Sequence, residues 1–174
     1  MNAVKHNKII QGAFATLALA LTVAQVWSSQ YALIDLGTLG GIESRAYGIN
    51  NLGQVVGYSS DANNDFRGFY WDGTMHDTGA VIGATQRIAY AINDAGQIAG
   101  LGYNYGDLQG QAFLSLNAAN LFVDSFSGRS INASGAVVGF ETLPGTVTGT
   151  VDHACIRSGG VLTDLGTLGG LDSY

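Results

Sequence analysis

Cysteine and proline are nearly absent from this chain, with one residue of each, Cys155 and Pro144, among 174. A single cysteine excludes an intrachain disulfide framework. We expect Cys155 to be buried, because it occupies an apolar position of a strand described below. The chain has 26 glycines. They recur at fixed places, which indicates tight turns and not a disordered linker.

Positive charge is also scarce. Lysine and arginine number 7 against 13 acidic residues, for a formal charge of -6. Both lysines, Lys5 and Lys8, lie in the N-terminal segment, and without them the charge is -8. An acidic, sparsely charged surface disfavours nucleic acid and anionic lipid as partners.

Patterns typical of catalysis are lacking. After the N-terminal segment only His76 and His153 remain, and no serine lies in a Gly-x-Ser-x-Gly turn. We find no metal-ligand cluster, phosphate loop or basic aromatic patch. His153 and Cys155 lie two residues apart on a strand and could pair as imidazole and thiol. We favour a strand that carries a small apolar residue there, so the pair does not predict an enzyme.

One long apolar run occurs, from Ile9 to about Val26, after a weakly basic start. This order predicts a secretory signal peptide over residues 1–28, cleaved between Ala24 and Gln30. The protein would then be secreted, periplasmic or held at the cell surface. An uncleaved anchor is the alternative, because a membrane span needs about 20 apolar residues. No second run appears, so we expect no membrane span after signal removal.

One nine-residue pattern is abundant. The frame Ile-Asn-x-x-Gly-x-[Val/Ile]-[Val/Ala]-Gly begins at Ile49, Ile92 and Ile131, at intervals of 43 and 39 residues. Asparagine accepts hydrogen bonds from the backbone two residues on, and glycine tolerates the positive φ of a tight hairpin. The pattern therefore predicts strand, tight turn and strand three times, with positive φ at Gly53 and Gly96.

Two more strand signals recur in each period. One surrounds an apolar position occupied by Phe69, Phe113 and Cys155, and the other ends at an aspartate. The four aspartates, which we expect to bind their own backbone and not to form a carboxylate ring, are Asp35, Asp77, Asp124 and Asp164.

Four strands in about 40 residues match one β-propeller blade. No helical periodicity follows the signal peptide. We predict an all-β fold of tandem four-stranded antiparallel repeats, a partial β-propeller within residues 29–174. The repeats would span about 42–79, 85–124 and 129–166, with an extra N-terminal strand from Tyr31 to Gly37.

These motifs resemble the bacterial extracellular HAF repeats. The resemblance rests on Asp-Leu-Gly-Thr-Leu-Gly-Gly at Asp35–Gly41 and Asp164–Gly170, on the Ile-Asn-x-x-Gly frame, and on the strand His153-Ala154-Cys155. It covers everything after residue 30, although the His-Ala-Phe triplet is imperfect. It implies an exported, propeller-like repeat protein and no catalytic residue.

The number of repeats bears on completeness. Three blades are fewer than the typical four to eight, roughly, of a closed propeller. The last residues, from Gly169 to Tyr174, match the start of a further unit. We expect a fragment of a longer propeller whose uncovered sheet faces favour self-association. A complete three-unit protein is the alternative.

One loop resembles a calcium site. Three oxygen ligands follow the spacing Asp-x-Asn-x-Asp, and a fourth carboxylate stands at the twelfth position. Phe66 replaces the glycine of such loops and Arg67 adds a positive charge, so a polar hairpin loop is the alternative. No other cofactor is expected. The candidate ligands are Asp61, Asn63, Asp65 and Asp72.

Aromatic residues gather in and beside two loops. Exposed rings stack on sugar faces and anchor protein partners. We therefore expect a non-enzymatic module for binding or surface structure, with a polysaccharide or protein as ligand. The alternative is the N-terminal part of a secreted carbohydrate-active propeller enzyme whose catalytic residues lie in missing blades. The candidate binding residues are Tyr58, Phe66, Tyr103 and Tyr105.

Overall fold

The computed structural model describes residues 31–80, 84–104, 111–116, 119–124, 126–144 and 150–173, with backbone only for 111–116 and 119–124. The expected signal peptide and Tyr105 lie outside these residues. The chain divides into two units, Met1–Leu33 and Ile34–Tyr174. The described residues contain no helix, and so none long and apolar enough to cross a membrane.

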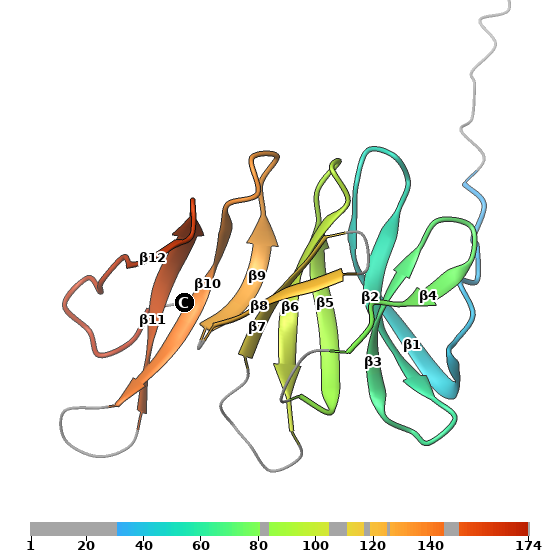
Figure 1. Cartoon of the computed structure of the whole chain (residues 1–174), viewed down its shortest axis with the longest axis horizontal. Helices are drawn as coiled ribbons and strands as arrows, with labels where there is room; N and C mark the ends of the chain where they lie inside the picture. Colours follow the sequence, from blue (N-terminus) through green and yellow to red (C-terminus); the bar gives the residue numbers. More distant parts are fainter. Residues whose placement is uncertain are drawn as a thin grey trace, which may run out of the picture. The chain divides into compact units, whose positions relative to one another are not determined.

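Twelve strands make up the described fold of the second unit (Figure 1). They form three antiparallel sheets in the orders β1-β2-β3-β4, β5-β6-β7-β8 and β12-β11-β10-β9. The predicted all-β class with four-stranded antiparallel repeats is confirmed. The strands are β1 (Gly40–Ile49), β2 (Val55–Asp61), β3 (Phe66–Trp71), β4 (Met75–Asp77), β5 (Gln86–Ile92), β6 (Gln97–Tyr103), β7 (Gln111–Leu116), β8 (Ala119–Asp124), β9 (Phe126–Ile131), β10 (Val137–Pro144), β11 (Thr150–Ser158) and β12 (Val161–Asp164).

The asparagine–glycine turns join the first two strands of each sheet. In the first turn, Asn50 Oδ1 accepts hydrogen bonds from the backbone N–H groups of Leu52 (3.1 Å) and Gln54 (3.0 Å). Gly53 has φ 77° and its N–H donates to the carbonyl of Asn50 at 3.1 Å. The turns at Asn93 and Asn132 repeat these bonds. The predicted turn chemistry is confirmed.

Successive sheets pack face to face through small and β-branched side chains. Val56 of the first sheet is fully buried against Ala89, Ile92 and Ile98 of the second. One repeat later, Ala99 of the second sheet, at the position of Val56, is fully buried against β9 and β10 of the third. In each sheet, the face that carries Val56 or its equivalent packs against the next sheet along the chain. We call it the following face. The described hydrophobic core thus lies between neighbouring sheets.

A glycine faces the apolar position in each sheet. Gly57 pairs with Phe69 and Gly139 with Cys155, and both apolar residues are fully buried. A Cβ on Gly57 would lie 1.9 Å from the Arg45 carbonyl oxygen. The first strand therefore approaches the second too closely for any side chain there. The prediction that Cys155 is buried in the place of Phe69 is confirmed.

A line of asparagine side chains links the three repeats. Asn50 Nδ2 donates to the carbonyl of Asn93 at 3.0 Å, and Asn93 Nδ2 donates to the carbonyl of Asn132 at 2.9 Å. We call these two bonds the asparagine ladder. Because the same side chain closes its own turn and holds the next one, each turn fixes the register of its neighbour.

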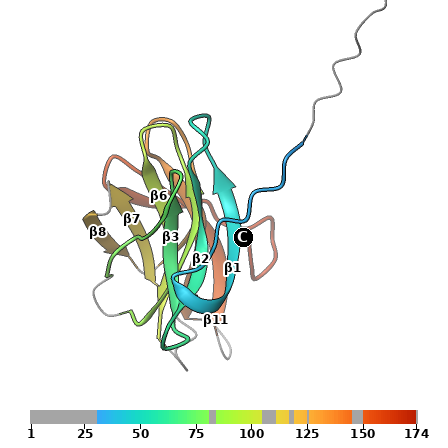
Figure 2. The same ribbon diagram turned by 90° about the vertical axis from the view of Figure 1, so that its right-hand side faces the viewer.

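The expected strand from Tyr31 to Gly37 is wrong. Residues 31–38 form no strand, and the first sheet begins with β1, which lies beside β2 and then β3 (Figure 2). A strand needs a partner ladder, and these residues make local bonds: Asp35 Oδ1 accepts from the Gly37 N–H at 2.9 Å. Asp77 and Asp164 bind the glycine two residues on in the same way. These aspartates therefore bind their own backbone, as expected.

Candidate functional site

A pocket of about 490 Å³ opens between the first and second sheets. The asparagine–glycine turns of both sheets contribute to it, together with β3, the hairpin to β4, β4 and the residue after it, and β6. Its volume lies within the roughly 300–1,000 Å³ typical of small-molecule sites. The lining residues are Gln54, Tyr70, Asp72, His76, Asp77, Thr78, Gly96 and Ile98.

A chain of hydrogen bonds crosses one wall of the pocket. The Tyr70 hydroxyl accepts from Gln54 Nε2 at 2.8 Å and donates to Asp72 Oδ2 at 3.3 Å. Asp72 Oδ1 lies 3.0 Å from His76 Nε2. The rings of Tyr70 and His76 stack, with centroids 5.8 Å apart, because β3 and β4 place the two residues opposite each other. Amide, phenol, carboxylate and imidazole thus form one network.

The network sets the charge of its members. The hydrogen bond from His76 lowers the pKa of the Asp72 carboxyl below its usual value. Burial raises the pKa of the Tyr70 phenol above its usual value. At neutral pH the wall therefore presents a carboxylate and a neutral phenol beside each other, which supplies hydrogen-bond acceptors and donors to a ligand rich in hydroxyl groups.

The opposite end of β4 is held rigidly. Thr78 is buried and its hydroxyl donates to the Gly68 carbonyl at 3.0 Å. Both carboxylate oxygens of Asp77 accept from the guanidinium of Arg87, at 3.1 and 3.2 Å. The Arg87 side chain is almost fully buried, and β5 carries it. The hydrogen bonds between Arg87 and Asp77 therefore connect the two sheets beside the pocket.

No family model, curated protein or solved structure matches the chain.

The four candidate calcium ligands do not come together. Asp61 Oδ2 binds Arg67 Nε at 2.9 Å, and its Oδ1 accepts from the backbone N–H groups of Asn63 (2.8 Å) and Asp65 (3.1 Å). Asp72 lies beyond the other end of β3, about 20 Å away by the usual strand rise. Within the described residues no group of three acidic, histidine or cysteine side chains could hold a metal ion. Calcium binding stays a prediction from the sequence alone.

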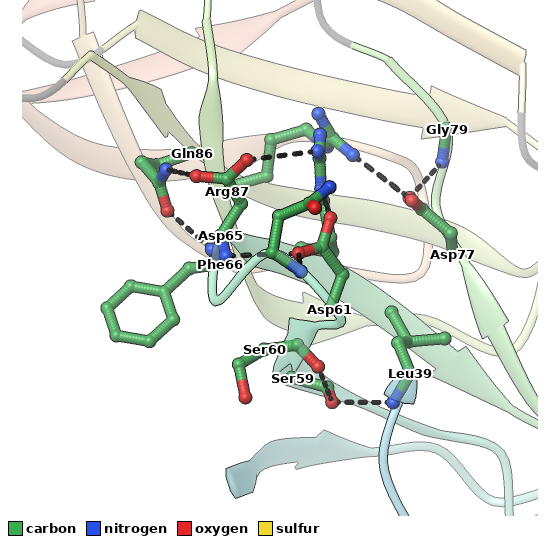
Figure 3. Close-up of polar contacts among 12 residues, drawn as sticks. Leu39, Ser59, Ser60, Asp61, Asp65, Phe66, Asp77, Gly79, Gln86 and Arg87 are labelled. Atoms are coloured by element: carbon green, nitrogen blue, oxygen red, sulfur yellow. Dashed lines mark hydrogen bonds and ion pairs between the residues drawn. The ribbon is translucent and has the colours of Figure 1, made fainter. Parts of the chain in front are cut away.

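One loop carboxylate, that of Asp65, instead joins the first two sheets (Figure 3). The Gln86 side chain donates to Asp65 Oδ1 at 2.9 Å and accepts from the backbone N–H of Phe66. Arg67 adds a second, weaker contact to Asp65, at 3.4 Å. A buried glutamine of β5 thus binds the hairpin between β2 and β3.

The four candidate binding aromatics do not form one exposed surface. Tyr58 is only 6% exposed, with its ring 4.8 Å from that of Phe66. Phe66 and Tyr103 are half-buried, and Tyr105 lies outside the described residues. Of the four, Tyr58 and Phe66 are brought together by this ring contact.

The predicted alternative of a thiol–imidazole pair is not present. The Cys155 thiol donates to the His153 carbonyl at 3.3 Å, and burial raises its pKa. The His153 imidazole binds Asp164, with Nδ1 2.8 Å from Oδ2. Neither group activates the other.

Three residues of the pocket wall were not predicted from the sequence: Gln54, Tyr70 and His76. The available signal was the alternation of Tyr70, Asp72, Thr74 and His76 across a tight hairpin, since residues two apart on strands share a face. Polar residues at four successive alternate positions predict one polar surface. Gln54 could not be found this way, because it reaches Tyr70 from another hairpin.

Proposed function

We propose that this chain is an exported, non-enzymatic binding module whose pocket holds a segment of polysaccharide. The observation that carries the proposal is the hydrogen-bonded wall formed by Gln54, Tyr70, Asp72 and His76 along a pocket of about 490 Å³. Planar polar side chains beside an aromatic ring are the groups that bind sugar hydroxyls and sugar faces.

Export is supported by the sequence of residues 1–28, which has the order of a signal peptide. The resemblance to the extracellular HAF repeats supports the same location. Sheets that pack face to face in series support a propeller-like arrangement, in which each repeat is one blade. In such scaffolds the regular strands carry stability, and the turns and hairpins carry binding.

A binding measurement on the purified chain tests the proposal. We expect an array of bacterial and plant glycans to yield at least one ligand, confirmed by calorimetry. Asp72→Asn should weaken its binding about tenfold, because a hydrogen bond to a charged group contributes roughly 1.5–3 kcal/mol. Asp35→Asn makes the same change of charge away from the pocket and should leave the affinity unchanged.

Two results would contradict the proposal. One is that no glycan binds to a chain shown to be folded by its cooperative unfolding. The other is that Asp72→Asn and His76→Gln both bind the glycan as well as the unchanged chain does. Release of reducing sugar from the bound glycan would show an enzyme in place of a binding module.

A further inference from the structure

The first strand of every sheet contains a β-bulge at the same place. Tyr47, Tyr90 and Arg129 each lack a partner on the neighbouring strand, although the residues on either side are paired. A bulge re-aims the side chain that it carries and is a designed feature of a sheet. Here it places three large planar side chains at equivalent positions of three successive sheets. The flanking pairs are Ala46–Gly57 and Gly48–Val56, Ala89–Gly100 and Ala91–Ala99, and Gly128–Gly139 and Ser130–Val138.

The three bulged residues touch one another across the sheets. The rings of Tyr47 and Tyr90 lie 5.4 Å apart between centroids, and the Arg129 guanidinium lies 4.3 Å from the Tyr90 centroid. The Arg129 guanidinium also lies 5.2 Å from the centroid of the Phe140 ring, and the Tyr58 ring lies 5.9 Å from that of Tyr47. A continuous row of planar groups therefore crosses all three sheets. We call it the planar row: Phe66, Tyr58, Tyr47, Tyr90, Arg129 and Phe140.

The planar row presents positive charge to solvent. Arg129 is exposed and forms no ion pair with a carboxylate of the described residues. Arg45 lies 5.8 Å over the Tyr58 ring, its side chain 63% exposed, and its contact with Glu43 is long, at 3.7 Å. The chain has a formal charge of -6. Two guanidinium groups on one row of rings are thus a local exception, and they form the basic aromatic patch that the sequence did not predict.

We infer that the planar row binds a linear acidic polysaccharide, one that contains uronic acid residues. Guanidinium groups bind carboxylates through two parallel hydrogen bonds. The rings of Tyr90 and Phe140 hold the Arg129 fork in place, so little side-chain entropy is lost on binding. Tyr47, which is 48% exposed, offers an aromatic surface to the apolar face of a sugar ring. A chain-like ligand fits a row that spans three repeats.

Single-stranded nucleic acid fits the planar row less well. Its bases need free ring faces, and its closely spaced phosphates need many cations. Of the rings in the planar row only Tyr47 is exposed, and two guanidinium groups are too few for a run of closely spaced phosphates. The inference rests on the proposed function, which supplies the ligand class, a polysaccharide. It places that ligand on the planar row and not in the pocket.

The test compares polygalacturonate with the same polymer after its carboxyl groups have been reduced, using calorimetry on the full chain. Arg129→Gln should weaken binding of the acidic polymer about tenfold and leave the reduced polymer unaffected, because a charge-assisted contact is lost. Arg129→Lys should give an intermediate loss, since lysine keeps the charge but not the planar fork. Arg157→Gln is the matched control for net charge.

The outcomes separate this inference from the proposed function. If Asp72→Asn weakens glycan binding but Arg129→Gln and Tyr47→Ala do not, the pocket binds and the planar row does not. If only the row variants weaken it, the row inference stands and the pocket assignment fails. Equal affinity for both polymers, or tighter binding of single-stranded DNA than of polygalacturonate, would overturn the inference. An unfolding midpoint for each variant shows that it is folded.

Discussion

At the residue scale, the turn glycines show how a backbone conformation limits side-chain choice. Gly53 has φ 77°, in the left-handed region, and a Cβ built there would meet no atom within 4 Å. Space is therefore available, and only the backbone conformation excludes a side chain. The same holds for Gly37 and Gly73.

Gly53→Val should lower the free energy of unfolding by more than about 1 kcal/mol, because a β-branched residue rarely adopts positive φ. Gly53→Asn should cost much less, since asparagine tolerates this region. Urea denaturation of both variants measures the difference. Equal losses for the two would show that crowding, and not φ, decides the position.

His153 makes stability depend on pH. The hydrogen bond to Asp164 raises the pKa of His153 above its usual value and lowers that of the Asp164 carboxyl. The histidine's contribution to stability is fully present below pH 6.5, about the pKa of an unfolded histidine. It is lost as the pH rises through the raised folded value. The carboxyl's contribution is lost as the pH falls through its lowered folded value.

We expect the thermal midpoint of unfolding to decrease as the pH is raised from about 6 to about 8. The decrease begins near the pKa of an unfolded histidine, because the stabilisation by protonated His153 is lost above it. His153→Gln should remove this part of the pH dependence, and His76→Gln, the other described histidine, should retain it. An NMR titration of the His153 ring would report the raised pKa directly. An unchanged pH profile in His153→Gln would contradict the assignment.

At the scale of elements, the asparagine ladder distinguishes otherwise equivalent turns. Asn93 Nδ2 binds both Gln97 Oε1, at 2.6 Å, and the carbonyl of the next turn. For Asn132 Nδ2 the described residues supply no partner, although its Oδ1 closes the turn as in the other repeats.

Asn93→Ala should therefore destabilise the protein by about 1–2 kcal/mol more than Asn132→Ala, because each net hydrogen bond contributes roughly 0.5–1.5 kcal/mol. Both variants lose the turn bonds that Oδ1 accepts, whereas Asn93→Ala alone also loses the Nδ2 bonds to Gln97 and to the carbonyl of Asn132. The difference therefore measures the ladder bond together with the Gln97 bond. Chemical denaturation measures the two values. Equal losses would show that the ladder adds no stability.

Elements also show the limit of sequence analysis. The hairpins, the four strands of each repeat and the burial of Cys155 followed from spacing and side-chain type, because turns and pleats are local. The bulges at Tyr47, Tyr90 and Arg129 left no signal, since a bulge is defined by the pairing of two strands. The strand expected at Tyr31 failed for a related reason: its pattern is local, but a strand needs a partner.

At the scale of the whole molecule, the stacking of sheets leaves unequal faces. Val56 and Ala99 are fully buried on the following faces of the first two sheets, whereas Val138, their equivalent in the third, is 40% exposed. On the opposite face of the first sheet, Ile49 is 69% exposed while its equivalent Ile92 is 7% exposed. The described residues thus expose the two kinds of apolar face that pack together within the chain.

Self-association of the chain, expected from the sequence, should accordingly depend on the following face of the third sheet. Val138→Asp should shift the sedimentation profile toward the monomer, because a charge buried in an apolar interface is costly. Val161→Asp, at an exposed position in β12, is the matched control. A monodisperse monomer at all concentrations would contradict the prediction.

The site could be predicted only in part, for reasons that belong to the whole molecule. Asp72 was predicted from the sequence as a calcium ligand, but it lies in the hydrogen-bonded wall of the pocket. Tyr58 and Phe66 were predicted as exposed binding residues, but they pack against each other in the planar row. The pocket combines Gln54 and Gly96, which lie in the turns of two different sheets that pack against each other. The planar row likewise requires three sheets to be aligned. Contacts between repeats decide both surfaces.

The asparagine ladder gives the stack of repeats a direction. Each amide donor belongs to the earlier repeat and each carbonyl acceptor to the later one. The two ends are therefore chemically unlike: the first turn offers an acceptor, the Asn50 carbonyl, and the third offers a donor, the Asn132 amide. An added repeat can form these hydrogen bonds in one orientation only. The array of repeats therefore has a direction, as a β-strand has a direction from its N-terminus to its C-terminus. Inverting a repeat would bring two donors or two acceptors together.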